Sequence, residues 1–70
     1  GRGWLRIGGA ALADGRVEID GRHVGHVPTL QEVTVGSRHV VVRSEAGEVL
    51  LDREIDVAVE HTQLRPLVVR

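Results

Sequence analysis

Short runs of alternating apolar and polar residues fill this chain, and glycines, prolines and Asp-Gly pairs separate them. A period of two residues is typical of a strand with one buried face. Before residue 48 the breakers recur too often for a long helix to fit. The pattern predicts strands at residues 4–7, 16–19, 22–24, 30–35, 37–43, 49–51 continuing through 55–60, and 67–69.

The strongest local signal is the Asp20-Gly21 pair between two of these runs. A type I′ turn needs a positive φ at both central residues, which Asp and Gly tolerate. We therefore expect a hairpin that joins residues 16–19 to 22–24. Asp20 is then a turn residue rather than a catalytic or calcium-binding carboxylate, because the remaining acidic residues are scattered along the chain.

Three other segments have less regular patterns. Val40–Val42 are three consecutive valines, which predict a strand covered on both faces. Residues 48–60 could form a short helix, but the Ile-x-Val-x-Val alternation of residues 55–59 favours a strand. Pro66 has no amide hydrogen, so it should begin an edge strand or lie on the unpaired side of one.

The number and spacing of the strands, six or seven of them, predict an all-β fold, either a small β-sandwich or an open barrel. We expect one domain over residues 1–70. Its predicted core consists of aliphatic residues from the runs: Leu5, Ile7, Val17, Ile19, Val24, Leu30, Val33, Val35, Val40, Val42, Ile55, Val57, Leu67 and Val69.

Composition removes several classes of function. A chain of 70 residues buries only about 60% of its unfolded surface, which leaves little room for a deep enzymatic cleft. The absence of Cys and Lys removes thiolate and Schiff-base chemistry. One aromatic residue and a net charge of −1 argue against nucleic-acid binding. No apolar stretch approaches the roughly 18 residues of a membrane span, so we expect no direct membrane insertion.

Histidines are the first candidates for chemistry. His23 and His26 are three residues apart, and positions i and i+3 of a strand face opposite sides unless Gly25 kinks the chain. His39 arrives from another strand. Two or three histidines without Cys or ordered carboxylates are a weak zinc signal, so we predict solvent-exposed turn histidines and no metal site.

Other candidates also favour structural roles. Ser37 and Ser44 lack a nucleophile context, and Gly8-Gly9 is a turn rather than a phosphate loop because no helix start follows it. The acidic run at 52–56 is interpreted as a solvated strand face that protects a sheet edge. Trp4 is expected to fill the core or a seam, because one ring makes a poor sugar platform. We predict no catalytic residue, cofactor or metal.

The ordered motifs Val17-Glu-Ile-Asp-Gly21, Val24-Gly25, Val27-Pro-Thr-Leu30, Val33-Thr-Val35 with Gly36, and Val40-Val-Val42 resemble the PEGA domain. The resemblance extends from residue 3 to residue 69 and is most specific between residues 17 and 28. It implies a small six- or seven-stranded antiparallel β-sandwich, immunoglobulin-like or transthyretin-like, that occurs as an appended or repeated module of bacterial surface-associated proteins and beside some serine/threonine kinases. The related bacterial transthyretin-like and carboxypeptidase-regulatory-like sandwiches stay open as a broader alternative. No catalytic residue is implied.

The chain departs from the family pattern at several positions. Leu12-Ala-Asp-Gly15 replaces the four residues that name the family, Val27 replaces a usual Thr, and Arg38 and Glu48 stand where rings are common. We therefore expect a divergent member with a weak core, excised from a larger protein. The resemblance suggests a bacterial, extracytoplasmic or envelope-associated location.

These observations predict a non-catalytic structural or protein-interaction module of a larger bacterial protein, acting as a spacer or docking domain. Its partner would be a protein or a neighbouring domain, bound by pairing with an exposed edge strand. The alternative is a glycan- or small-ligand-binding accessory domain, which requires Trp4 exposed at a concave surface. The oligomeric state and the partner's identity stay open.

Overall fold

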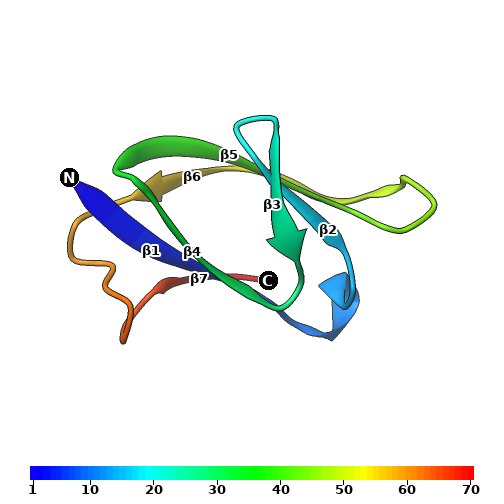
Figure 1. Ribbon diagram of the computed structural model, residues 1–70, viewed down its shortest axis with the longest axis horizontal. Coiled ribbons are helices and arrows are strands. Elements are labelled where there is room, and N and C mark those ends of the chain that lie inside the picture. Colours follow the sequence, from blue (N-terminus) through cyan, green and yellow to red (C-terminus); the bar gives the residue numbers. More distant parts are fainter.

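Seven strands form where apolar and polar residues alternate, and the computed structural model describes them over residues 1–70 (Figure 1). They are β1 (Arg2–Ile7), β2 (Arg16–Ile19), β3 (Arg22–His26), β4 (Thr29–Thr34), β5 (Gly36–Arg43), β6 (Val49–Val57) and β7 (Leu67–Val69). The predicted all-β fold is confirmed, and β6 occupies the segment for which a helix was the rival prediction.

The strands form two sheets that face each other (Figure 1). One sheet has the order β4-β1-β7, and the other has the order β3-β2-β5-β6. Every pair is antiparallel except β1 with β7, which is parallel. The predicted antiparallel sandwich is therefore correct apart from this pair, where the chain crosses between the sheets after β6.

The only helical element is a 3-10 turn, η1 (Ala10–Leu12), which follows Gly8-Gly9. This turn corrects the expectation that no helix start follows the two glycines. It seats Leu12 in the core, at 3% exposure. No helix in the structure is long and apolar enough to cross a membrane.

The core joins the inner faces of both sheets in one cluster of 12 buried aliphatic residues. Val17, Val40 and Val42 come from the four-stranded sheet, and Leu5 and Ile7 come from the other sheet. Val24, Val33 and Leu67 pack against this cluster while only partly buried. Most of the predicted core is therefore confirmed.

Two predicted core residues are wrong. Leu30 lies opposite Arg6 on the outer face of the three-stranded sheet, and Val35 is only partly buried beyond the end of β4. Leu30 has the opposite parity to Val33, so the two cannot share a face of one regular strand. Three buried aliphatic residues were not predicted: Leu12, Val27 and Leu51.

The local predictions for turns and edges are largely confirmed. Asp20 and Gly21 have φ values of 52° and 82°, as the hairpin between β2 and β3 requires. Val41 is buried on the face opposite to Val40, so the valine run is covered on both sides. Pro66 directly precedes β7, an edge strand. The strand predicted to continue to residue 60 instead ends at Val57.

Trp4 does not fill the core. It alternates with the buried residues Gly3 and Leu5, so its side chain lies on the outer face of the three-stranded sheet, opposite Glu32. It is half-buried there. Gly3 occupies the inner position instead, where an added Cβ would lie 2.5 Å from the carbonyl oxygen of Ala58.

Candidate edge-strand docking site

The two open sheets leave four strand edges, formed by β3, β4, β6 and β7. A free edge exposes backbone N–H and C=O groups that can pair with another strand. β3 and β4 are consecutive in the chain and are the edges of opposite sheets on the same side of the sandwich (Figure 1). This side is the candidate functional site.

Three of the four edges carry features that discourage strand pairing. β6 bears alternating acidic residues on its outer face, and Arg53 lies opposite Val40 on its inner face. β7 is only 3 residues long. β3 contains a bulge in its pairing with β2, and Gly25 there has a φ of 154°. Charges, shortness and bulges are the usual protections of sheet edges.

β4 lacks these protections. Its six residues pair with β1 in unbroken register, from Thr29 opposite Ile7 to Thr34 opposite Arg2. It contains no proline and one charged residue, Glu32. β4 is therefore the edge best suited to accept an added strand.

Backbone geometry identifies the amides that β4 presents. The N–H of Val35 donates to the carbonyl of Gly1 at 3.1 Å. Because hydrogen-bonded pairs alternate along an antiparallel ladder, the odd-numbered residues of β4 bond β1. The N–H and C=O groups of the even-numbered residues point away from β1, towards the free edge: Leu30, Glu32 and Thr34. Trp4 is likewise an even-numbered residue, on β1, and its N–H points away from β4 and donates to the carbonyl of His61 at 2.8 Å.

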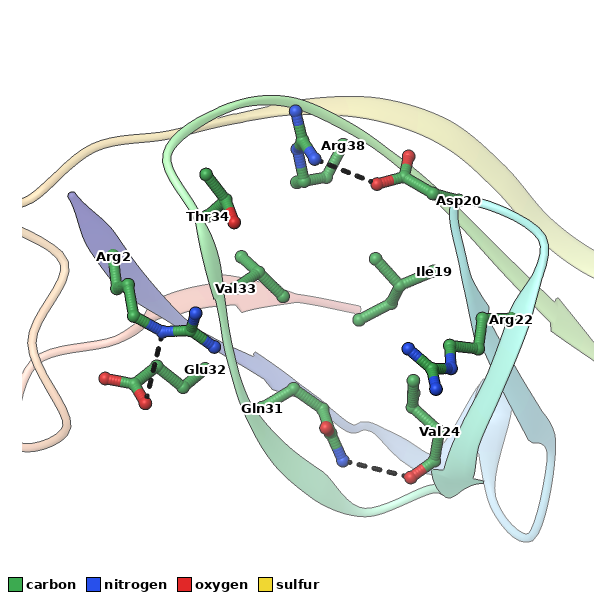
Figure 2. A pocket seen from close by; sticks show the side chains of 10 residues that line it. All are labelled: Arg2, Ile19, Asp20, Arg22, Val24, Gln31, Glu32, Val33, Thr34 and Arg38. Atoms are coloured by element: carbon green, nitrogen blue, oxygen red, sulfur yellow. Dashed lines mark hydrogen bonds and ion pairs between the residues drawn. The ribbon is translucent and has the colours of Figure 1, made fainter.

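A hollow of about 390 Å³ lies between β3 and β4, and we call it the β3–β4 hollow (Figure 2). Ile19, Val24 and Val33 supply its apolar lining. Gln31 spans it, because its side-chain amide donates to the carbonyl of Val24 at 3.2 Å. Glu32 and Thr34 of β4 also line it, so the hollow runs along the free edge of this strand.

Three arginines surround the apolar lining, and two of them have acidic partners. Nε of Arg2 lies 3.4 Å from a carboxylate oxygen of Glu32. An Nη of Arg38 donates to Asp20 at 3.1 Å. Arg22 has no acidic partner within ion-pair distance, so the lining carries one excess positive charge.

Arg38 has unused hydrogen-bonding capacity. It lies on the inner face of β5, in register with Ile55, and its side chain is 29% exposed. Its Nε is buried and has no hydrogen-bond partner. A guanidinium has five N–H donors, and leaving a buried one unpaired costs free energy. Because Nε is buried, only the Nη groups of Arg38 can meet an acceptor from outside, and their one partner within the chain is Asp20.

Asp20 holds Arg38 in place. One carboxylate oxygen accepts the backbone N–H of His39 at 2.9 Å, and the other accepts the bond from Arg38. The predicted turn role of Asp20 is confirmed by its positive φ, and its role as the anchor of Arg38 was not predicted. This contact joins the β2–β3 turn to β5, a pairing that local sequence does not reveal.

The outer face of the four-stranded sheet carries a separate polar network. Nε2 of His39 donates to Asp52 at 2.6 Å, and the hydroxyl of Ser37 donates to Glu54 at 2.6 Å. The hydrogen bond to Asp52 raises the pKa of His39 above its usual value of 6.5, and desolvation opposes it. These contacts link β5 to β6, so Ser37 and His39 have a structural role in joining the two strands.

His23 and His26 come together on one face of β3, with ring centroids 5.3 Å apart. The bulge around Gly25 puts both outside, opposite Glu18 and Arg16 respectively. The chain is therefore kinked near Gly25, which is the condition that the sequence analysis set for the two histidines to share a face. No group of three or more potential ligands is placed to hold a metal ion. His26 also lines a second hollow, of about 360 Å³, with Asp14, Arg16 and Glu45.

Sequence reasoning did not identify the arginines of the β3–β4 hollow. The sequence does contain one indication for Arg38: it lies at an alternate position with Val40 and Val42, which places it on the buried face of β5. An inward-facing arginine at a strand end is unusual unless it is paired. Nothing local could show that Arg22 and Gln31 line the same hollow.

Comparison with known protein families, curated proteins and solved structures finds no match to this chain. The resemblance to the PEGA domain therefore stays a prediction.

Proposed function

We propose that this chain is a non-catalytic protein-interaction module that binds an extended segment of a partner along the edge of β4. The observation that supports this most directly is the unprotected, regular register of β4 beside a hollow. Main-chain hydrogen bonds would supply affinity, and the side chains that line the hollow would supply selectivity.

The proposal fits a spacer or docking domain of a larger protein. The sequence motifs between residues 17 and 42 support a divergent PEGA-like accessory module of a bacterial, envelope-associated protein. In such a context the partner segment would belong to a neighbouring domain or to a second protein.

The alternative, a glycan-binding module, requires an aromatic platform at a concave surface. Trp4, the only aromatic residue, lines neither hollow. The backbone edge of β4 therefore supports docking of a peptide segment better than binding of a sugar.

The proposal is tested by selecting ligands from a phage-displayed library of random linear ten-residue peptides on the wild-type chain. The selected peptides should shift the backbone amide NMR signals of Leu30, Glu32 and Thr34. They should bind the Glu32→Ala variant but lose binding to Glu32→Pro, which lacks the outward N–H. The two variants both remove the carboxylate, so the comparison isolates the backbone donor.

Two outcomes overturn the proposal. In one, the selected peptides shift the backbone amide signals of β3, β6 or β7 and leave those of β4 unchanged. The other is that no peptide from the library shifts the amide signals of β4. Peptides that do shift these signals but bind Glu32→Pro as well as wild type would overturn the proposal in the same way. Circular dichroism of each variant verifies that the sandwich is intact in every comparison.

A further inference from the structure

We propose that the segment docked on β4 carries an acidic side chain, which enters the β3–β4 hollow and is bound by Arg38 and Arg22. This inference rests on the proposed docking function and adds the chemistry of the partner. It depends on the charge and the hydrogen-bonding capacity of the hollow rather than on the backbone edge.

The charge balance favours an anion. Arg2 and Arg38 already have carboxylate partners within the chain, whereas Arg22 has none. The lining therefore carries an excess positive charge beside the apolar side chains of Ile19 and Val24. Low-dielectric walls strengthen the attraction of such a charge for a partner anion.

Arg38 contributes geometry as well as charge. Asp20 occupies one of its Nη atoms, and its buried Nε–H has no acceptor. The Nη N–H groups that Asp20 leaves free can donate to a carboxylate from outside, and charge-assisted hydrogen bonds of this kind are short and strong. A neutral apolar side chain in the same position would cover these Nη groups and leave them unpaired.

The strand geometry explains how an acidic side chain would arrive. Side chains of an added strand alternate between the two faces of the sheet, so every second one turns towards the space between the sheets. Residues of both parities on β4 line the hollow, which places the hollow directly beside the incoming strand (Figure 2). One inward side chain of the partner would thus lie among Arg22, Arg38 and Gln31.

The test compares two synthetic peptides, acetyl-Thr-Val-Glu-Val-Thr-amide and the same peptide with Gln in place of Glu. Each is titrated into the ¹⁵N-labelled chain. The backbone amides of β4 report docking, and the Nε–Hε signal of Arg38 reports entry of the carboxylate. We expect the Glu peptide to bind on the order of tenfold more tightly and to shift the Arg38 signal.

Variants assign the discrimination to the hollow. Arg38→Gln and, separately, Arg22→Gln should reduce the preference for the Glu peptide. Arg22→Gln leaves the Arg38–Asp20 pair intact, so it stays informative if Arg38→Gln perturbs the fold. Arg53→Gln is the matched control, because it makes the same charge change on the distant edge strand β6 and should preserve the preference.

The outcomes separate the two proposals. Equal binding of the Glu and Gln peptides at the β4 amides overturns the acidic-partner inference and leaves edge docking standing. An unchanged preference in both Arg22→Gln and Arg38→Gln also overturns the inference. If neither peptide perturbs β4 while library peptides do, the acidic-partner inference fails alone. If library peptides also leave β4 unperturbed, both proposals fail.

Discussion

At the residue scale, Asp20 shows how one side chain serves both the fold and the candidate site. Its positive φ allows the tight turn between β2 and β3, and its two carboxylate oxygens fix His39 and Arg38 of β5. The turn, the sheet and the arginine of the β3–β4 hollow therefore depend on one residue. Much of the rest of the fold depends on small aliphatic side chains.

Leu5 is the residue whose truncation tests that core most simply. It is fully buried in the cluster that joins the sheets. Leu5→Ala should lower the free energy of unfolding by about 2–5 kcal/mol, through lost burial and the cavity that remains. Leu64→Ala is the matched control, because Leu64 is 93% exposed and should change stability by at most about 0.5 kcal/mol. Urea denaturation measures both, and equal effects would contradict the core assignment.

His39 makes stability depend on pH. Its folded pKa is raised above 6.5, chiefly by the hydrogen bond to Asp52. A raised folded pKa gives a stabilising contribution that is complete below pH 6.5 and is lost as the pH rises through the folded value. The stability advantage of wild type over His39→Gln should therefore be larger at acidic pH than at alkaline pH.

Urea denaturation of both proteins at several pH values measures that difference. The NMR titration of His39 is the direct check, and its pKa should fall towards 6.5 in Asp52→Asn. A stability difference that grows as the pH rises would contradict the ion-pair geometry.

At the scale of elements, β4 is the edge without protection. Its inward and outward amides alternate, so proline should have opposite effects at adjacent positions. Glu32→Pro removes an outward N–H and should change stability by at most about 1 kcal/mol. Val33→Pro removes a donor to β1 and should cost at least about 2 kcal/mol. Thermal denaturation followed by circular dichroism measures both, and a reversed order would show that the register of β4 is wrong.

The local sequence predicted most strands because period-two alternation is written in consecutive residues. It could not predict the parallel pairing of β1 with β7, because the paired residues, such as Leu5 and Leu67, lie 62 positions apart in the chain and meet only through the crossing between sheets. The burial of Leu12 depends on a 3-10 turn with no periodic signal. The β3–β4 hollow could not be predicted either, because its arginines come from three strands that are separate in the sequence, β1, β3 and β5.

At the scale of the whole molecule, the two sheets share one hydrophobic cluster, so neither has a core of its own. Small domains with a single core usually unfold in one cooperative step. Trp4 fluorescence reports the three-stranded sheet, and far-ultraviolet circular dichroism reports both sheets. The two urea transitions should coincide, whereas a separate earlier transition of Trp4 would indicate that the sheets unfold independently.

The central claim is that the free edge of β4 binds an extended partner segment. Amide hydrogen exchange of the chain, with and without a peptide selected from the random library, tests it most directly. Leu30, Glu32 and Thr34 should exchange faster than Gln31 and Val33 in the free chain, because their amides point away from β1. With the peptide bound, these three amides should become protected. Protection confined to β3, β6 or β7, or no new protection on β4, would contradict the claim.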